Sequence, residues 1–257
     1  MERNGVLIFE RKGDIAHLTI SNPPRNRLPD PVIADPMVLK GWLNQPGLRG
    51  VIITGAGNNF SEGAELRGKE LDRLDERLDC GKESLDALEQ SPVPVVAAIN
   101  GACFGGGLEI ALACHLRVVG STSLLGFPEG DLGLLPGLGG TWRATQVIGL
   151  RKALPFLLSS ERVTGDRALE LGLAHYSVPR QEVFNKALEV LHRMLGDKPA
   201  YVIHCIMKAI VGGITQDRKS ALALETKLFL ELMQAKRSDS TEEIIVDGNN
   251  KQTSMAS

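Results

Sequence analysis

The 257-residue sequence has few aromatic residues, almost no net charge and no long hydrophobic run. Aromatic side chains make up only 4% of the chain and the formal net charge is −2, so neither base stacking nor attraction to phosphates favours a nucleic-acid partner. No apolar run reaches the roughly 18 residues that a membrane helix requires, and the N-terminal segment has no apolar stretch typical of a signal peptide. These absences predict a cytoplasmic protein that binds neither nucleic acid nor a membrane.

The motifs of several common enzyme classes are missing too. The four cysteines and five histidines show no metal-ligand spacing. No glycine cluster is followed by GK[ST], no GxGxxG follows a first strand, and no serine stands in GxSxG. The pattern therefore argues against a phosphate-binding loop, a dinucleotide-binding fold and a serine hydrolase elbow, and we expect neither a metal nor a cofactor.

The sequence does contain short apolar runs that alternate with helical patterns. The runs are rich in β-branched residues, as in strands covered on both faces, and lie at 6–9, 15–20, 50–54, 93–99, 116–119 and 173–178. Helical spacing occurs at 71–90, 107–115, 141–149, 165–171 and 182–195. This order is typical of an α/β fold with crossover connections. After about residue 197 the strands stop, and two helices are expected at 199–211 and 218–235, before a polar tail.

The stretch ACFGGGLEIALA, residues 102–113, combines three consecutive glycines with a lone glutamate in an apolar helix. Glycine allows close backbone approach and free aiming of N–H groups, whereas a carboxylate in apolar surroundings is costly unless it is paired or used. The stretch predicts a strand, a tight turn and a helix start that carries Glu109. The alternative is a packing corner whose glutamate forms a buried ion pair with Arg117 or Arg143.

Two further glycine-bearing stretches require a common explanation with the first. FSEGAELRG (60–68) also follows a strand, and GFPEGDLGLLPGLGGT (126–141) adds a second isolated carboxylate, Glu129. Unpaired N–H groups at such turns can form an oxyanion hole, which stabilises charge developing on a carbonyl oxygen. A polarised carbonyl with carboxylates as acid and base is the chemistry we expect. Glu129 could instead brace its own loop, and 136–141 are expected to be a turn and helix N-terminus.

Four blocks together are similar to the crotonase (enoyl-CoA hydratase/isomerase) superfamily. They read NNFSEGAEL (58–66), PVPVVAAINGACFGGGLEIALAC (92–114), LGFPEGDLGLLPGLGGT (125–141) and RVTGDRALELGLAHYSV (162–178). The resemblance implies an α/β crotonase-like spiral of ββα units with two roughly perpendicular sheets in a core domain of residues 1–196. It also implies a C-terminal helical region, residues 197–257, that builds homotrimers, often paired into hexamers. The implied substrates are acyl thioesters of coenzyme A.

The resemblance assigns roles to individual positions. The oxyanion-hole donors would be the backbone N–H groups of Ala64 and Gly106, and the catalytic glutamates would be Glu109 and Glu129. The remaining expected substrate contacts are Glu65, Leu66, Arg67, Gly105, Arg25 and Arg27. Of these, the two arginines at 25 and 27 either contact nucleotide phosphates or are merely solvated.

Two glutamates favour the addition of water to a trans-2-enoyl thioester, with one carboxylate activating water at C3 and the other protonating C2. Glu109 lies in a first helical turn, where the helix dipole favours the ionised form, so it is expected to be the base. Glu129 lies among apolar residues that should raise its pKa, so it is expected to be the acid. The alternatives are an enoyl-CoA isomerase, an acyl-thioester decarboxylase or hydrolase, and a non-catalytic crotonase-like assembly protein.

The chain departs from the family pattern at several positions. Arg27 stands where a small residue is common, within the proline-rich segment 22–46, and Glu62 replaces a small residue before the oxyanion loop. These departures put the choice between coenzyme A and an acyl-carrier protein in doubt. His115 stands where an aspartate is common, and a histidine satisfied within the core is its expected role.

Overall fold

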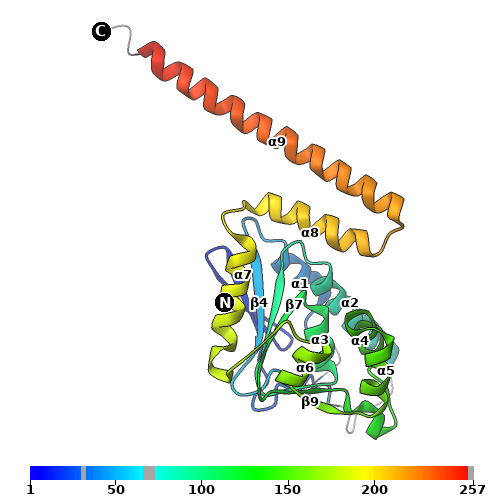
Figure 1. Ribbon diagram of the computed structural model, residues 1–257. Helices are drawn as coiled ribbons and strands as arrows, with labels where there is room; N and C mark the ends of the chain where they lie inside the picture. Colours follow the sequence, from blue (N-terminus) through cyan, green and yellow to red (C-terminus); the bar gives the residue numbers. More distant parts are fainter. Residues whose placement is uncertain (30–32, 66–72, 254–257) are drawn as a thin grey trace. The chain divides into compact units, whose positions relative to one another are not determined.

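The computed structural model describes residues 1–29, 33–65 and 73–253, and within these ranges it describes side chains as far as residue 237. The chain divides into two compact units, Met1–Ala200 and Tyr201–Ser257 (Figure 1). The predicted α/β fold with an added C-terminal helical region is confirmed.

Within the described residues, the first unit holds a seven-stranded sheet in the order β1-β2-β3-β4-β5-β7-β10 and a three-stranded sheet in the order β6-β8-β9. In the large sheet β1, β2 and β3 are antiparallel neighbours, and β3, β4, β5, β7 and β10 run parallel. Its strands are β1 (Glu2–Asn4), β2 (Leu7–Lys12), β3 (Ile15–Ile20), β4 (Gly50–Gly55), β5 (Val95–Ile99), β7 (Leu116–Gly120) and β10 (Tyr176–Val178). The small sheet consists of β6 (Ala102–Phe104), β8 (Leu124–Gly126) and β9 (Arg162–Thr164).

The first unit also contains nine described helices, some of which pack on the large sheet. They are α1 (Pro36–Leu43), α2 (Leu74–Glu89), α3 (Gly106–Ala113), the 3-10 helix η1 (Pro128–Leu132), α4 (Gly140–Ile148), α5 (Leu150–Leu158), α6 (Gly165–Leu171), the 3-10 helix η2 (Arg180–Glu182) and α7 (Val183–Leu195). Helix α7 packs against β4, β5 and β7 on one side, and α1, α2 and α3 lie on the other (Figure 1). Every residue of β5 is therefore buried, as its unbroken apolar run predicts.

The small sheet places the chemistry-bearing segments next to each other. Strand β6 leads into α3, which carries Glu109, and β8 leads into η1, which carries Glu129. The two strands pair in parallel with Phe104 opposite Gly126, and the Gly105 N–H donates to the Gly126 carbonyl at 3.0 Å. Helix α3 and the 3-10 helix η1, which are separate in the sequence, therefore begin next to each other.

The predicted elements agree with the observed ones except at a few boundaries. Strand β5 begins at Val95 rather than at residue 93, since Pro94 has no N–H to contribute to a ladder. In the proline-rich segment a short helix, α1, begins at Pro36, with the Asp35 side chain accepting from the Met37 and Val38 N–H groups at 2.8 and 3.2 Å. Helix α5 and the strands β1, β8 and β9 were not predicted, and β6 is separate from the apolar run 93–99 that precedes it.

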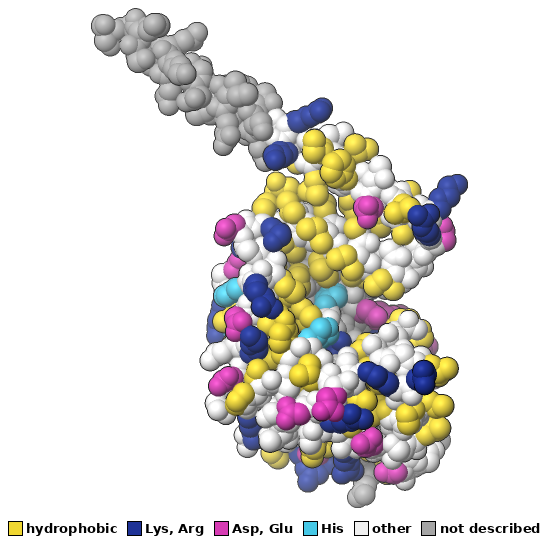
Figure 2. Space-filling view, in the orientation of Figure 1, with side chains coloured by type: hydrophobic (Ala, Val, Ile, Leu, Met, Phe, Trp, Pro, Cys, Tyr) yellow, Lys and Arg dark blue, Asp and Glu magenta, His cyan; other side chains and the backbone are white. Residues whose placement is uncertain are grey.

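The second unit consists of helices α8 (Ala200–Ile214) and α9 (Arg218–Thr253). A Cβ added at Gly212 would lie 3.0 Å from Leu224 Cδ2, so glycine allows the two helices to approach closely. Apolar side chains are exposed on both helices, as Figure 2 shows; they include Tyr201, Ile206, Ile210, Ile214, Leu222, Phe229, Leu230 and Met233. Helix α9 continues beyond 235 through a mostly polar stretch, where the apolar periodicity that predicts a helix has ended.

Candidate active site

The predicted oxyanion donors lie close together. A Cβ added at Gly106 would lie 3.6 Å from the Ala64 nitrogen, and one added at Gly63 would lie 3.0 Å from the Gly106 nitrogen. Gly105, which precedes α3, has a φ of +52°, a conformation that side chains other than glycine rarely adopt. In the described part of the chain, neither the Ala64 N–H nor the Gly106 N–H donates to a protein acceptor. Both groups are therefore available to a ligand oxygen.

Loop residues 25–28 hold this part of the site in place. The Leu28 N–H donates to the Gly63 carbonyl at 2.9 Å, and the Glu65 N–H donates to the Leu28 carbonyl at 2.9 Å. The buried Asn26 side chain donates to the backbone carbonyls of Ala56 and Asn59 at 2.8 and 2.7 Å. These bonds fix the backbone around Ala64, which is what an oxyanion donor requires.

Glu109 is buried, with only 1% of its surface exposed. Its Oε1 accepts hydrogen bonds from the backbone N–H groups of Leu138 and Gly140, both at 2.7 Å, at the start of α4. The expected alternative, a buried ion pair, is absent among the described residues. Arg143 pairs instead with Asp86 and Glu89, at 2.8 and 3.0 Å. Backbone N–H groups thus hold Oε1 of Glu109, and its second oxygen, Oε2, can take part in a reaction.

Burial raises the pKa of Glu109 to about 7. The hydrogen bonds from Gly140 and Leu138 oppose this rise, the negative charge of Glu129 adds to it, and Arg143 opposes it. The expectation that the helix dipole keeps this carboxyl ionised is therefore wrong in direction, because desolvation outweighs the dipole. A carboxyl that titrates near neutral pH can take up and release protons at the operating pH.

The raised pKa of Glu109 predicts a pH-dependent cost to stability. The folded state holds the proton more tightly than the unfolded chain, so the free energy of unfolding falls as the pH rises from the unfolded pKa of about 4.5 to about 7. Glu109→Gln removes this titration. The free energy of unfolding of the variant should therefore rise relative to that of the parent by roughly 3 kcal/mol between about pH 4 and pH 8.

Urea unfolding of both proteins across this pH range measures the gain. Glu170→Gln, which removes an exposed carboxylate paired with Arg167 on α6, controls for the loss of charge alone. A difference between Glu109→Gln and the parent that stays constant with pH would contradict a raised pKa of Glu109.

Glu129 lies on η1 across from the oxyanion turn. Its Oε1 lies next to Gly105, where an added Cβ would stand 2.5 Å from it, so a side chain at position 105 would displace this carboxyl. Its Oε2 is buried with no hydrogen-bond partner in the described part of the chain. Desolvation raises the pKa of Glu129, in the direction that the sequence predicts. An unpartnered buried carboxyl oxygen is suited to a ligand or a reacting proton.

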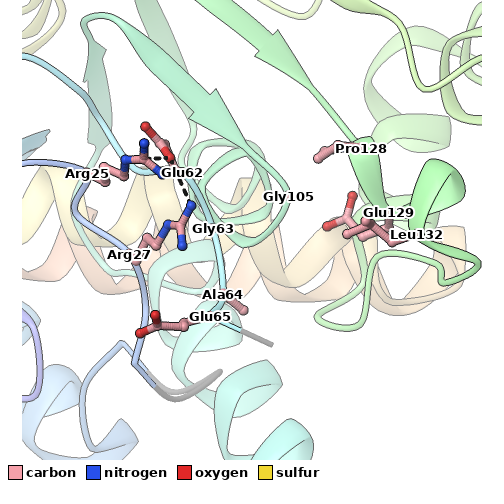
Figure 3. Close-up of a pocket in the computed structure, with 10 residues that line it drawn as sticks. All are labelled: Arg25, Arg27, Glu62, Gly63, Ala64, Glu65, Gly105, Pro128, Glu129 and Leu132. Carbon is pink, nitrogen blue, oxygen red and sulfur yellow. Dashed lines mark ion pairs between the residues drawn. The ribbon is translucent and has the colours of Figure 1, made fainter. Parts of the chain in front are cut away.

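A pocket of about 410 Å³ opens between these segments (Figure 3). Its lining includes several predicted substrate contacts: Arg25, Arg27, Ala64, Glu65, Gly105 and Glu129. Leu132 and Pro128 contribute apolar surface beside Glu129. Leu66 and Arg67, also predicted to contact the substrate, lie outside the described residues. Glu109 and Gly106 are not among the lining residues, although Gly106 adjoins Gly105 at the pocket wall.

Other residues weighed in the sequence have structural roles. His115 Nδ1 accepts from the Val95 N–H at 2.9 Å, and its Nε2 lies 3.1 Å from the Glu89 carbonyl. Arg117 donates to the backbone carbonyls of Leu173 and Cys114 at 2.6 and 2.7 Å. Residues 136–141 do form the turn and helix start that the sequence predicts. The donation from Leu138 and Gly140 to Glu109 was missed, because no local pattern signals a carboxylate 29 residues earlier.

Known proteins share both the sequence pattern and the fold. The family model for enoyl-CoA hydratase/isomerase matches residues 10–245. The chain is 34% identical over 232 residues to a probable enoyl-CoA hydratase of Bacillus subtilis, covering 86% of this chain and 88% of that protein. It is 33% identical over 237 residues to a short-chain-enoyl-CoA hydratase of Clostridium acetobutylicum, covering 90% of each. The structure of Pseudomonas aeruginosa DspI superposes with a TM-score of 0.82 at 30% identity, covering 91% of this chain and 90% of that one. The chain belongs to the enoyl-CoA hydratase/isomerase family.

Neither a membrane helix nor a metal cluster is found in the described ranges. No helix there is both long and apolar enough to cross a membrane. No group of three or more histidine, cysteine, aspartate or glutamate side chains gathers there in a way that could hold a metal ion.

Proposed function

We propose that the protein is an enoyl-CoA hydratase-type lyase that adds water across a trans-2-enoyl thioester, or removes it in the reverse direction. The observation that carries the proposal is the pairing of two desolvated carboxyls, Glu109 and Glu129, with two N–H groups, of Ala64 and Gly106, that two neighbouring loops bring close together and that have no acceptor among the described residues. The relatives named enoyl-CoA hydratase, which match most of the chain, support the same activity.

The proposed reaction places the thioester carbonyl oxygen between the N–H groups of Ala64 and Gly106. Glu109 takes a proton from a water molecule while the oxygen of that water bonds to C3. The electrons of the double bond move toward the carbonyl. The two N–H groups stabilise the enolate oxygen that forms. Glu129 then gives its proton to C2. The proton that Glu109 took returns to Glu129 through solvent before the next turnover, so the net change is OH added at C3 and H added at C2. These steps use only protein groups, so the reaction as proposed needs no cofactor.

Burial raises the pKa of both Glu109 and Glu129, so these shifts do not tell the base from the acid. The proposed assignment of base and acid therefore rests on the hydrogen bonds of the two carboxyls. Two N–H donors on Glu109 favour its ionised form, which a base requires. Glu129 Oε2 has no donor among the described residues, which favours the protonated form that an acid requires. Glu109 is therefore the proposed base and Glu129 the proposed acid.

The second candidate is a double-bond isomerase, which moves one proton with one carboxylate and needs no water. One observation favours it: Glu129 lines the pocket, whereas Glu109 is not among the lining residues. Incubation with crotonyl-CoA distinguishes the two, because hydration removes the absorbance of the conjugated enoyl group. Unchanged absorbance together with conversion of a 3-enoyl thioester would select the isomerase. Release of free coenzyme A would indicate a hydrolase, and no reaction with any thioester would indicate a non-catalytic protein.

We further propose that the protein acts in the cytoplasm as a homotrimer or hexamer, with residues 197–257 serving assembly. The exposed apolar side chains of α8 and α9 support this role, because contiguous apolar surface of this kind is typical of interfaces.

Deletion of residues 199–257 should therefore give a monomeric or aggregating protein, measured by size-exclusion chromatography with light scattering. Deletion of residues 247–257 alone, a polar stretch, should leave the assembly unchanged. A soluble trimer after the larger deletion would argue against an assembly role for this region.

A further inference from the structure

Glu62 lies between two arginines at the pocket (Figure 3). Its Oε2 is 3.7 Å from Arg25 Nε and 3.5 Å from an Arg27 terminal nitrogen. The Glu62 side chain is 22% exposed, whereas those of Arg25 and Arg27 are 58% and 37% exposed. All three residues line the same cavity as Ala64 and Glu129.

Glu62 leaves hydrogen-bond donors of the two guanidinium groups unused. Both distances exceed ordinary hydrogen-bond length, and within the described residues neither side chain donates a hydrogen bond to the protein. A guanidinium carries five N–H donors in a fixed fork that matches the oxygens of a phosphate. Two such groups facing one cavity can therefore hold an anionic ligand group more strongly than they hold Glu62.

The position of this cluster is tied to the oxyanion hole. The Glu62 N–H donates to the Arg25 carbonyl at 3.0 Å, and the Leu28 N–H donates to the Gly63 carbonyl at 2.9 Å. The Ser61 hydroxyl donates to the buried Asn26 carbonyl at 2.7 Å. The loop that carries the arginines and the loop that carries Ala64 are thus joined by hydrogen bonds. These bonds fix the distance between the arginines and the site proposed for the reacting carbonyl.

We propose that Glu62 is a specificity-determining residue, an internal competitor that occupies Arg25 and Arg27 until a phosphate of the thioester's carrier replaces it. The inference rests on the proposed function, which makes the substrate a thioester of a phosphate-bearing carrier arm. Glu62 lowers the charge of the cluster from two positive charges to one. It therefore weakens phosphate binding and leaves the phosphate-free part of the arm unaffected.

Calorimetric binding tests this without turnover, using pantetheine, 4′-phosphopantetheine and free coenzyme A as probes. With Glu62→Gln, at least one phosphate-bearing probe should bind about two- to fivefold more tightly than to the parent, and pantetheine should bind equally. Arg27→Gln should weaken binding of the same probe by a similar factor. Glu170→Gln, a matched Arg–Glu pair on α6, should change none of the three.

The two phosphate-bearing probes identify the source of the phosphate. A response of both places the pantetheine-linked phosphate at the arginines, and a response of coenzyme A alone places a nucleotide phosphate there; either supports the competitor role. The gain with Glu62→Gln should shrink as salt is raised, because the added charge is partly exposed. It should also vanish when Arg25 and Arg27 are both glutamine.

A purely structural role of Glu62 gives a different result. The competitor role would be wrong if Glu62→Gln changed the affinity for pantetheine as much as the affinity for the phosphate-bearing probes. It would also be wrong if Glu62→Gln weakened or left unchanged the binding of both 4′-phosphopantetheine and coenzyme A. Failure of the proposed function is seen separately, as absence of crotonyl-CoA turnover by the parent protein.

Discussion

Glu109→Gln and Glu129→Gln should each slow hydration of a short trans-2-enoyl thioester by about 10²–10⁴-fold. Hydration needs both a base for water and an acid for C2, so neither carboxylate can replace the other. Glutamine keeps an oxygen that can accept from the Leu138 and Gly140 N–H groups, and it has the same size. The substitution therefore removes proton transfer while the start of α4 keeps its contacts. Steady-state kinetics with crotonyl-CoA measures the loss.

The double variant should be little worse than either single one, because residues that act as one unit lose their function together. Glu170→Gln, far along the chain on α6, serves as the charge control and should match the parent. If Glu109→Gln hydrated normally while a 3-enoyl substrate still isomerised through Glu129, the isomerase would be the better description. Two single variants that both matched the parent on every thioester would contradict any role for the pair.

Gly106→Val should leave the protein folded and cost about 10²–10³ in turnover, the loss expected when one oxyanion donor is displaced. A Cβ at this position would already lie 3.0 Å from Leu28 Cδ1 and 3.6 Å from the Ala64 nitrogen. The branched side chain of valine therefore crowds the place where the carbonyl oxygen would bind. The loss should appear in kcat, since the oxyanion contact strengthens in the transition state.

Gly41→Val is the matched control, because a Cβ at Gly41 meets nothing within 4 Å. It should retain the activity of the parent. Circular dichroism and light scattering would confirm that both variants are folded and assembled alike. A folded Gly106→Val protein of near-normal activity would show that the carbonyl does not bind at this turn.

Much of this architecture could be predicted from the sequence because its strongest signals are local. The all-apolar run that became β5 indicates a strand covered on both faces, and it is buried throughout. The glycines before Glu109 indicate a turn that other residues cannot form, and Gly105 has the positive φ that this requires.

The parts that could not be predicted depend on contacts between distant segments. The strands of the small sheet are three residues long, too short for any periodicity, yet their pairing sets Phe104 opposite Gly126 and lets the Gly105 N–H donate to the Gly126 carbonyl. The pKa of Glu109 follows from complete burial, which a first-turn position does not reveal. The ion pairs of Glu62 arise because backbone bonds join residues 25 and 62, which are 37 positions apart.

Incubation of the protein with crotonyl-CoA in water labelled with heavy oxygen tests the central claim most directly. Mass spectrometry of the thioester product shows whether an oxygen atom from the solvent is bonded to the acyl chain. The two-carboxylate mechanism predicts a 3-hydroxyacyl thioester that carries one heavy oxygen at C3, and predicts that Glu109→Gln and Glu129→Gln form it far more slowly. An acyl chain that gained no labelled oxygen at C3, while a 3-enoyl thioester was isomerised or free coenzyme A was released, would contradict the account.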